Sequence, residues 1–363
     1  MDDSVELAKK LLGFETVSPL EEKEPLVFLK NVLEEQGIDS EIIQENGVYS
    51  LYSEFGGEDK ICFNGHIDTV CSNGDWTRKP FQPEIVEGKI YGRGASDMKS
   101  GLAAEVMAYI DIFRDPEFSG GASLMVTGDE EIGGFDGTEK LLEMHGEKIK
   151  YAVIGEPTGL DIQVGMRGVV WPTIIIEGES VHSSRPEKVD NILEKLPEVL
   201  EKLKNVELTY EKPDKLEEPT WPVTNVSTAG GTNSIPGKVE IEMDVRTVPS
   251  MKPETIRKDI EEAMEETGVE YRVEVREMGK PVTLDDEKFL EKVEQVVGKI
   301  TGKKPDRSFS GGSSDARFFS VENIPVVEIG PEEETAHMKD EYCSTDKIRE
   351  LRKIYRETAK ELV

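Results

Sequence analysis

Two neighbouring glutamates, Glu130 and Glu131, lie in the stretch TGDEEIGG at residues 127–134. Like charges directed into one cleft repel each other, so a fold that brings both there needs a positive counter-charge. Adjacent side chains of an extended strand point to opposite sides, and both can reach one site only where the strand breaks into a turn. Gly133 and Gly134 favour such a turn, because glycine tolerates positive φ. The stretch therefore predicts a counter-charge at the end of a strand.

A histidine and an aspartate stand in a similar position earlier in the chain. His66 follows the apolar run KICFNG at residues 60–65, and Asp68 lies two positions further on, in NGHIDTV. Open α/β sheets bind ligands beyond the carboxyl ends of their strands. Asp68 can face the same way as His66 and accept a hydrogen bond from its second ring nitrogen, the usual arrangement behind a metal-bound histidine. Taken alone, this pattern is weak evidence for a metal site.

Three more candidates share this kind of position. Asp97 follows the glycine-rich turn of YGRGASDMKSG, where we expect a helix to open; by itself it could be a residue favoured there by the helix dipole. Glu156, in GEPT, follows the apolar run YAVIG at residues 151–155. His337, in GPEEETAHMKDEY, lies beyond the run IPVVEI. Each places a possible metal ligand at the end of an element.

Together these residues form a set that could hold metal ions: His66, Asp97, Glu131, Glu156 and His337. Those that follow apolar strands converge on one edge of one sheet. Two neutral imidazoles and three carboxylates suffice for two divalent cations if one carboxylate bridges them. Nitrogen and oxygen donors without thiolates suit zinc, cobalt or manganese. Such cations are the counter-charge that the two glutamates need.

The elements that must position this set alternate between amphipathic helices and short apolar runs, as in an α/β layered domain. Helices are expected at residues 4–14, 24–37, 96–113, 287–300 and 345–362, and apolar strands at 60–65, 122–128, 151–155 and 323–331. The order changes between residues 168 and 280, where the patterns follow the β-α-β-β-α-β order of the ferredoxin-like motif. We therefore expect a metal-binding domain at 1–167 and 281–363, with a second domain inserted at 168–280.

Length and composition limit the classes of protein that remain. A chain of 363 residues exceeds the roughly 250 to 300 residues at which one core stops growing. The net charge of -31 argues against nucleic acid or an anionic membrane as a partner. No stretch approaches the roughly 18 to 20 apolar residues of a membrane span, and MDDSVELAKK lacks a secretory pattern, so we expect a cytoplasmic protein. Three widely spaced cysteines indicate neither disulfides nor a cysteine zinc site.

The motifs, taken in order, resemble those of a known family. They are His-x-Asp, Gly-Arg-Gly-x-x-Asp-Met-Lys, Asp-Glu-Glu, Gly-Glu-Pro-Thr and a late histidine. In this order they resemble the dinuclear zinc amidohydrolases and peptidases of family M20, which includes acetylornithine deacetylase, succinyl-diaminopimelate desuccinylase, aminoacylase and glutamate carboxypeptidase. The resemblance covers essentially the whole chain. It implies a zinc-exopeptidase-like catalytic domain, with a mixed sheet between helices, and an inserted ferredoxin-like lid and dimerisation domain.

The resemblance also implies roles for the candidate residues. One metal would be held by His66, Asp97 and Glu156, and the other by Asp97, Glu131 and His337, so that Asp97 bridges the two. Glu130 would act as the general base on a water that bridges the metals, and the resulting hydroxide would attack the carbonyl. Asp68 would support His66 from behind.

In the inserted domain, His182 in EGESVHSSRP matches a histidine that reaches the partner's active site in dimeric members of the family, although an isolated histidine of this kind is more often a surface residue. The match implies a homodimer through the lid. The expected substrate contacts are Arg167, Asn233, Arg246, Gly312 and Ser313. Guanidinium groups suit a substrate carboxylate, and backbone amides of a glycine-rich loop suit an acyl or carboxylate oxygen. Arg317 could serve in the same way, or could pair with Asp315.

The substrate is indicated by two conflicting stretches. SGGSSDARFF resembles desuccinylase-like members, whereas HMKDEY resembles the deacetylases. We expect hydrolysis of the amide bond of an N-acyl amino acid, of the N-acetylornithine or N-succinyl-diaminopimelate type. A dipeptidase or carboxypeptidase of the same family is the closest alternative. A non-catalytic binding protein would lack a ligand or the base, and none is missing here.

Overall fold

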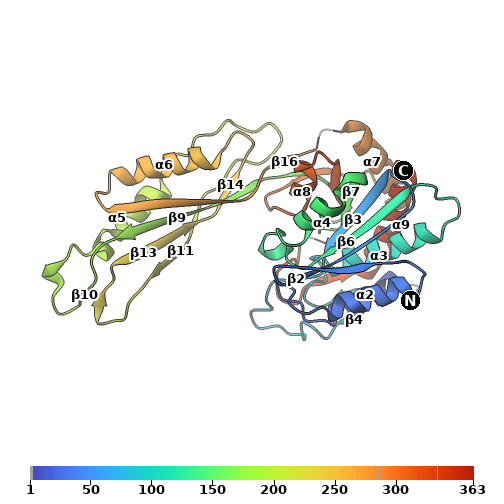
Figure 1. Cartoon of the computed structure of the whole chain (residues 1–363), viewed down its shortest axis with the longest axis horizontal. Coiled ribbons are helices and arrows are strands. Elements are labelled where there is room, and N and C mark those ends of the chain that lie inside the picture. The colour runs from blue at the N-terminus through green and yellow to red at the C-terminus, as the bar shows by residue number, and fades with distance from the viewer. Residues whose placement is uncertain (1–2, 285, 333) are drawn as a thin grey trace. The chain divides into compact units, whose positions relative to one another are not determined.

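The chain divides into two compact units in this computed structural model, which describes residues 3–284, 286–332 and 334–363. The first unit comprises Met1–Val164, Thr283–Ser308 and Ser314–Val363, and the second comprises Gly165–Val282 and Phe309–Ser313. The second unit is thus inserted into the first, and runs from yellow-green to orange in Figure 1. It also takes in the segment Phe309–Ser313, which the sequence-based boundaries did not include.

The first unit is built on a mixed sheet with the strand order β1-β2-β6-β3-β7-β18-β8-β16, and with β17 paired to β8. These strands are β1 Glu41–Glu45, β2 Val48–Phe55, β3 Lys60–His66, β6 Gly121–Thr127, β7 Ile149–Ile154, β8 Ile162–Met166, β16 Val282–Thr283, β17 Arg307–Ser310 and β18 Val326–Glu328. Strands β6, β3, β7 and β18 run parallel to one another, and β1 and β2 are antiparallel. The predicted α/β class with a mixed sheet is confirmed.

The continuous apolar runs of the central strands follow from their place in the interior of the sheet. Strands β3 and β6 are buried along their whole length. A strand covered on both faces carries a continuous apolar run rather than an alternating one. Because the strands are parallel, the register places His66 beside Thr127 and places Asn64 beside Ile154. The carboxyl ends of three strands therefore meet at one edge of the sheet.

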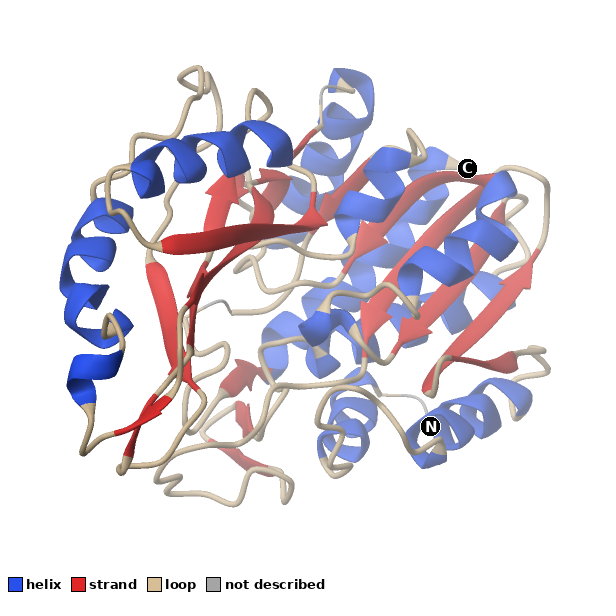
Figure 2. Ribbon diagram, turned by 60° about the vertical axis from the view of Figure 1, so that its left-hand side comes forward, coloured by secondary structure: helices blue, strands red, loops and turns tan. Residues whose placement is uncertain are grey.

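Helices pack around this sheet (Figure 2). They are α1 Ser4–Leu12, α2 Glu24–Glu34, α3 Lys99–Arg114, α4 Thr138–His145, α7 Glu287–Thr301, α8 Ala316–Val321 and α9 Thr345–Leu362, with 3-10 turns η1 Glu130–Ile132 and η2 Gly146–Lys148. Helix α3 is buried on most sides and packs against α1, α9 and β3. It begins at Lys99 rather than at Ser96, so Asp97 lies in the turn before the helix and not at its opening. None of the described helices combines the length and the apolar composition that a membrane span requires.

A small separate sheet joins two distant parts of the first unit. Its strands are β4 Glu84–Val86, β5 Lys89–Tyr91 and β19 Tyr342–Ser344, in the order β19-β5-β4. Strands β19 and β5 are antiparallel, with Tyr342 opposite Tyr91. The chain that leaves β5 leads into the turn of Asp97, and the chain that enters β19 comes from His337. The sheet thus holds both segments together.

The second unit follows the predicted β-α-β-β-α-β order. Its elements are β9 Gly168–Glu177, β10 Val181–His182, η3 Pro186–Lys188, α5 Ile192–Lys204, β11 Val223–Thr228, β12 Ser234–Ile235, β13 Lys238–Met243, β14 Val245–Thr247, α6 Pro253–Glu265 and β15 Glu270–Gly279. The main sheet has the order β11-β13-β9-β14, and β15 also pairs with β9. Helices α5 and α6 pack on this sheet and share its core, which includes Ile174, Ile241, Leu203 and Ile260. The sequence pattern predicts a helix from Pro186 to Leu203, but α5 starts only at Ile192, where the Asn191 side chain caps it by accepting from the Leu193 amide.

Candidate metal centre

The candidate ligands lie where the parallel strands end. His66 is the last residue of β3, beside Thr127 at the end of β6. The chain leaves β6 into the 3-10 turn Glu130–Ile132, and leaves β7 into the segment that carries Glu156. Gly133 ends the 3-10 turn with a φ of 121°, a conformation that favours glycine. The predicted break of the strand into a turn at the two glutamates is confirmed.

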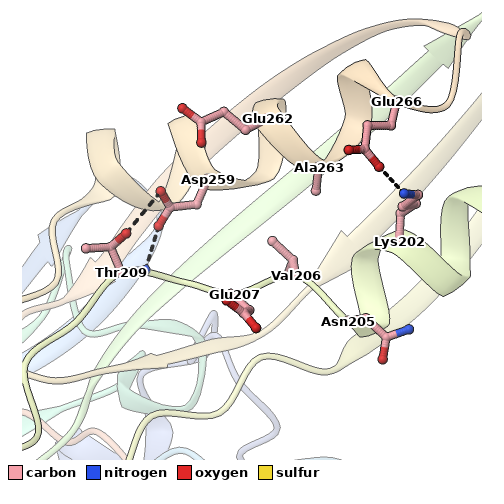
Figure 3. Close-up of a pocket in the computed structure, with 9 residues that line it drawn as sticks. All are labelled: Lys202, Asn205, Val206, Glu207, Thr209, Asp259, Glu262, Ala263 and Glu266. Carbon is pink, nitrogen blue, oxygen red and sulfur yellow. Dashed lines mark hydrogen bonds and ion pairs between the residues drawn. The ribbon is translucent and has the colours of Figure 1, made fainter.

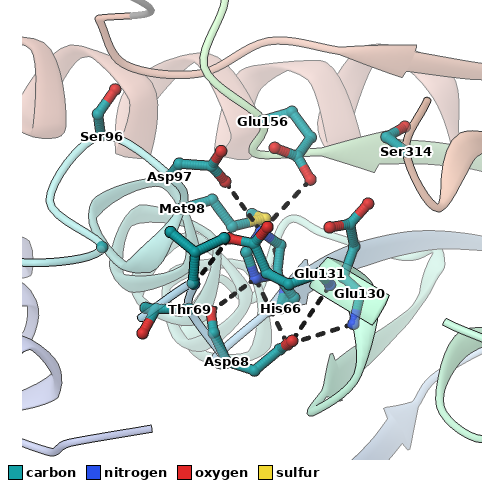
Figure 4. Close-up of polar contacts among 12 residues, drawn as sticks. His66, Asp68, Thr69, Ser96, Asp97, Met98, Glu130, Glu131, Glu156 and Ser314 are labelled. Carbon is teal, nitrogen blue, oxygen red and sulfur yellow. Dashed lines mark hydrogen bonds and ion pairs between the residues drawn. The ribbon is translucent and has the colours of Figure 1, made fainter. Parts of the chain in front are cut away.

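Asp97 occupies the middle of the group. The Nε2 atom of His66 lies 3.0 Å from Oδ1 of Asp97 and 3.6 Å from Oε1 of Glu156. The Nε2 atom of His337 lies 3.2 Å from Oδ2 of Asp97 and 3.2 Å from Oε1 of Glu131. Figure 4 shows these carboxylates gathered around the His66 ring. Asp97 therefore presents one carboxyl oxygen to each histidine, which is the geometry of a bridging ligand.

The donor set fits divalent metal ions. Among the described residues, two triplets have their ligand atoms within 4.8 Å of one another: His66 with Asp97 and Glu131, and His66 with Glu130 and Glu156. Imidazole nitrogen and carboxylate oxygen without thiolate are donors that suit zinc, cobalt or manganese. These triplets divide the ligands differently from the sequence-based assignment, because one of them includes Glu130. The donor atoms of this group can therefore hold divalent cations.

The neighbouring carboxylates raise the pKa of both candidate histidines. Burial disfavours a charged His66, but the carboxylates of Asp68 and Asp97 outweigh it and hold the pKa of His66 well above its ordinary value. Hydrogen bonds to Asp97 and Glu131 raise the pKa of His337 to about 10. Burial acts to raise the pKa of Asp97, yet its bonds to both imidazoles keep that pKa below the ordinary value. Positive charge is thus stabilised at this position of the fold.

The two other carboxyls show that the group carries an excess of negative charge. Burial raises the pKa of Glu130 well above its ordinary value, and the nearby carboxylates of Asp315 and Glu131 add to the effect. Burial and the charge of Asp97 likewise raise the pKa of Glu156 well above its ordinary value. Divalent cations would offset this repulsion and favour the ionised carboxylates. The electrostatics therefore agree with the donor chemistry.

Asp68 has backbone partners in addition to the His66 ring. The Nδ1 atom of His66 bonds to the backbone carbonyl of Asp68 at 2.9 Å, and the carboxylate oxygen lies further away, at 3.5 Å. The carboxylate also accepts from the backbone amides of Glu130, at 3.3 Å, and of Glu131, at 3.2 Å. The ring thus makes its shorter bond to the Asp68 carbonyl, and the Asp68 carboxylate faces the same nitrogen at the longer distance of an ion pair. The carboxylate is turned toward two amides that the 3-10 turn leaves without a strand partner, and so it holds the turn that carries both glutamates.

Sequence reasoning missed a buried pair beside the centre. Arg93 and Glu341 are 2% and 0% exposed, and they form an ion pair of 2.7 Å. Arg93 lies within the Gly-Arg-Gly motif and Glu341 four residues after His337, so both stood inside quoted motifs without receiving a role. Burial raises the pKa of the Asp315 carboxyl, and the charge of Arg317 acts to lower it. The Arg317 guanidinium donates to the carbonyls of Ser314, at 2.7 Å, and of Gly133, and so supports the turn of the two glutamates.

The remaining predicted residues belong to the second unit: Arg167, His182, Asn233, Arg246, Gly312 and Ser313. The exposed His182 ring bonds through Nδ1 to Ser184 Oγ at 2.9 Å. Arg246 pairs with Asp244 at 2.9 Å. These candidates thus belong to the second unit, whereas the proposed metal ligands belong to the first.

Within the second unit, Arg167 lies against the glycine-rich loop. Its guanidinium donates to the carbonyl of Glu218 at 2.8 Å. A Cβ atom on Gly311 would lie only 2.5 Å from Nη2 of Arg167, so no larger residue fits there without displacing the guanidinium. Gly312 donates its amide to Ser310 Oγ at 2.9 Å. Arg167 and the loop that contains Gly312 and Ser313 therefore form one local cluster.

A pocket of the second unit involves none of these residues (Figure 3). It is lined by Lys202, Asn205, Val206, Glu207, Thr209, Asp259, Glu262, Ala263 and Glu266. Lys202 pairs with Glu266 across it, and Asp259 accepts from the Thr209 amide at 2.6 Å. The lining contains none of the candidate ligands or substrate contacts predicted from the sequence.

Comparison with known proteins agrees with this geometry. The chain is 32% identical to the succinyl-diaminopimelate desuccinylase of Halorhodospira halophila, over 98% of this chain and 97% of that protein. It is 34% identical to the enzyme of the same name from Nautilia profundicola, over 98% of this chain and 99% of that protein. Identities at this level over nearly the full length of both chains indicate common ancestry and a shared fold.

Solved structures share the whole architecture. The M20 family metallo-carboxypeptidase Sso-CP2 of Sulfolobus solfataricus superimposes with a TM-score of 0.84 at 20% identity, covering 99% of each chain. A dinuclear metal binding peptidase of the M20 family from Bacillus subtilis gives a TM-score of 0.72 at 19% identity, covering 98% of this chain and 96% of that one. Residues 62–361 match the family described as peptidase family M20/M25/M40. The chain therefore belongs to the M20/M25/M40 peptidase family.

Proposed function

We propose that this chain is a two-metal hydrolase that cleaves the amide bond of an N-acyl diamino acid, with N-succinyl-diaminopimelate as the substrate type. The observation that carries the proposal is the position of Asp97, whose two carboxyl oxygens face His66 and His337. The choice of acyl group is supported by the full-length relatives, which are named succinyl-diaminopimelate desuccinylases.

The stretches SGGSSDARFF and HMKDEY indicate different substrates, and the burial of Glu341 in the second stretch favours the first as a guide to the acyl group. HMKDEY was the stretch that resembles the deacetylases. Its glutamate, Glu341, is completely buried and bonds to backbone amides and to Arg93. A residue with no exposed surface does not select an acyl group by contact. The loop SGGSSDARFF, with its resemblance to desuccinylases, then remains the more informative of the two.

The proposed ligands are those implied by the family pattern. His66, Asp97 and Glu156 would hold one ion, and Asp97, Glu131 and His337 the other. Zinc is the proposed metal, and cobalt or manganese suits the same donors. When bound, such a pair polarises an amide carbonyl and lowers the pKa of water at the site.

Glu130 is the proposed general base. It lies beside His66 in the turn held by Asp68, and burial raises the pKa of its carboxyl well above the ordinary value. A carboxylate with a raised pKa takes a proton from the attacking water more readily, and can deliver it to the leaving amine. Asp68 keeps the backbone of Glu130 in place, and so fixes the direction from which the proton is taken.

The second unit is proposed to recognise the substrate and to form a homodimer. His182 would donate to the oxyanion in the partner's site, and Asn233 would contact the substrate. Arg167 and Arg246 would bind carboxylates of a succinyl or diamino acid group, next to the amides of Gly312 and Ser313. The outer edge of β11 ends the main sheet and its residues are largely exposed, which leaves backbone groups available to a second copy.

The test combines metal analysis with a substrate panel. The purified chain is loaded with zinc, cobalt or manganese, its metal content is measured, and amine release is followed from N-succinyl-diaminopimelate, N-acetylornithine and several dipeptides. We expect two ions per chain, preferential release from the succinyl compound, and loss of activity after chelation. Faster release from a dipeptide would favour the dipeptidase or carboxypeptidase alternative. No release from any compound with two ions bound would contradict the enzyme function.

A further inference from the structure

A buried ion pair connects the two segments that carry Asp97 and His337. Arg93 lies two residues after β5, and Glu341 lies directly before β19. The Nη1 atom of Arg93 donates to Oε2 of Glu341 at 2.7 Å, although the residues are 248 positions apart. A charge pair without exposed surface is stable only when its remaining donors and acceptors are satisfied. The partners of these groups therefore indicate what the pair does.

Glu341 binds the backbone of the Asp97 turn. Its Oε1 atom accepts from the amide of Ser96 at 2.7 Å and from the amide of Asp97 at 3.0 Å. Its Oε2 atom accepts from the amide of Gly94 at 3.0 Å, in addition to the bond from Arg93. Charge-assisted bonds of this kind are about twice as strong as neutral ones. The carboxylate thus fixes the backbone from which the proposed bridging ligand projects.

Arg93 binds the backbone of the His337 segment in return. Its Nη2 atom donates to the carbonyl of His337 at 3.3 Å and to that of Cys71 at 3.4 Å, and Nη1 reaches the carbonyl of Met338 at 3.4 Å. The guanidinium also lies 5.0 Å from the centre of the Trp76 ring. A planar fork can make these bonds together, whereas an ammonium cannot. The segment with Asp97 therefore holds His337, and the segment with His337 holds Asp97.

A second ion pair of the first unit provides a comparison. Arg352 on α9 and Asp111 on α3 form a bidentate pair with both bonds at 2.7 Å. It joins two packed helices, and neither helix carries a candidate ligand. Both pairs join distant parts of the chain. The pair of Arg93 and Glu341 bonds directly to the backbone of the candidate ligands His337 and Asp97.

We propose that Arg93 and Glu341 are positioning residues that set the separation of Asp97 and His337, and thereby the affinity for the metal that these two residues share with Glu131. The proposal rests on the two-metal assignment of the proposed function. The other metal depends on the pair only through Asp97, because His66 and Glu156 project from strands of the main sheet and from the segment that follows them. Loss of the pair should therefore weaken the two metals unequally.

The test is a cobalt or zinc titration of the metal-free protein, in the wild type and in Glu341→Gln. The substitution keeps the size of the side chain but removes the charge and replaces one acceptor by a donor. We expect the second ion to bind about 10- to 100-fold more weakly, the range found when a partner behind a metal ligand is removed. The first ion should lose less affinity. At low metal kcat should fall with little change in KM, and excess metal should restore it.

Two further variants separate positioning from general stability. Arg93→Lys keeps the buried positive charge but lacks the fork, so it should show the same unequal loss of metal; this variant also decides the question if Glu341→Gln does not fold. Asp111→Asn should lower the thermal midpoint and leave both metal affinities unchanged. Normal binding of two ions by Arg93→Lys and Glu341→Gln would overturn the proposal, and so would an equal loss of both ions.

The same measurements distinguish a failure of the positioning proposal from a failure of the proposed hydrolase function. Two ions in the wild type, an unequal loss in the variants and no amine release from any substrate would overturn the substrate assignment and support the positioning pair. Amine release with two ions bound in wild type and variants alike would support the function and overturn the pair. A wild type that binds one ion only would contradict both.

Discussion

His66 and Asp68 of the first unit and His182 of the second unit differ in how firmly the fold holds them. In the first unit, His66 and Asp68 are 1% and 0% exposed, and their bonds reach across strands and turns. In the second unit, His182 is exposed and its ring bonds to Ser184, two positions away. Its neighbour Ser183 donates to the carbonyl of Asn233 within the short pairing of β10 and β12. His66 and Asp68 are thus fixed by long-range buried bonds, whereas His182 lies on a surface ribbon with local bonds.

This difference matches the two proposed tasks. Metal ligands must keep their mutual distances within a few tenths of an ångström, which buried hydrogen bonds can ensure. Residues that receive a substrate, or reach into a partner subunit, must remain accessible and can adjust when the ligand arrives. We therefore expect substitutions in the first unit to affect metal binding and the rate of chemistry. Substitutions in the second unit should affect turnover without affecting metal.

The largest effect is expected from Glu130→Gln. The substitution removes the proposed base and leaves all proposed ligands in place, so kcat should fall by about 10²- to 10⁴-fold with two ions still bound. The neighbouring Glu131→Gln is the matched control, because it removes a proposed ligand and should lose metal as well. Steady-state kinetics and elemental analysis of both variants provide the measurement. Equal loss of metal in the two variants would contradict the division of roles between the adjacent glutamates.

The next effect is expected from His182→Ala, which tests whether the second unit contributes to chemistry at all. Loss of an oxyanion donor lowers kcat by about 10²- to 10³-fold, and metal content should not change. If His182 acts in the partner's site, each mixed dimer of His182→Ala and Glu130→Gln contains one intact site. Random reassortment of equal amounts should then restore about a quarter of the wild-type activity, because half the dimers are mixed. No recovery in verified mixed dimers would rule out catalysis across the interface.

A smaller effect is expected from Asp68→Asn. An amide in place of the carboxylate would direct a donor toward the backbone amides of Glu130 and Glu131 and loosen the turn that carries them. We expect kcat to fall by about 10- to 100-fold, with a smaller loss of metal than in Glu131→Gln. Asp136→Asn is the control, since its carboxylate lies beyond the same turn and bonds to Asn46 at the surface. Similar kinetics for the two variants would show that Asp68 does not hold the turn.

The smallest effect concerns stability. Glu105 on α3 is completely buried, and burial raises the pKa of its carboxyl well above the ordinary value, although a backbone hydrogen bond from Gly155 acts to lower it. Because the folded pKa exceeds the unfolded one, its protonated form is favoured by folding, and stability falls as pH rises from the unfolded pKa toward the folded pKa. Glu105→Met should remove this fall. Each kcal/mol that the substitution adds to the free energy of unfolding should raise the thermal midpoint by roughly 2 to 4 °C.

The measurement is the thermal midpoint of Glu105→Met and of wild type between pH 5 and pH 8. We expect the thermal midpoint of the variant to exceed that of wild type most at the higher pH. There the wild type must either bury the charged carboxylate or take up a proton when it folds. Glu117→Gln, at an exposed carboxyl beyond the end of the same helix, should give a pH profile like that of wild type. A gain for Glu105→Met that does not depend on pH would show that better packing, and not the buried carboxyl, is the cause.

Much of the fold could be predicted, because the signals are local. The helix expected at residues 345–362 forms at Thr345–Leu362, and the strands that end at His66 and Thr127 are continuous apolar runs. The start of α3 was placed too early, since nothing local distinguishes Ser96 in the turn from Lys99 in the helix. The bonds that the Asp68 carboxylate accepts from backbone amides were also missed, because those amides lie more than sixty positions away.

The sequence by itself determined which chemical groups are present, their order along the chain and their position at the ends of elements, since apolar periodicity and glycine turns act over a few residues. Only the tertiary structure decided that one oxygen of Asp97 faces His66 and the other faces His337. It also decided that Glu341 is buried beneath them rather than exposed to a substrate. These outcomes depend on hydrogen bonds between segments hundreds of residues apart, and such bonds exist only after parallel strands have brought their carboxyl ends to one edge of the sheet.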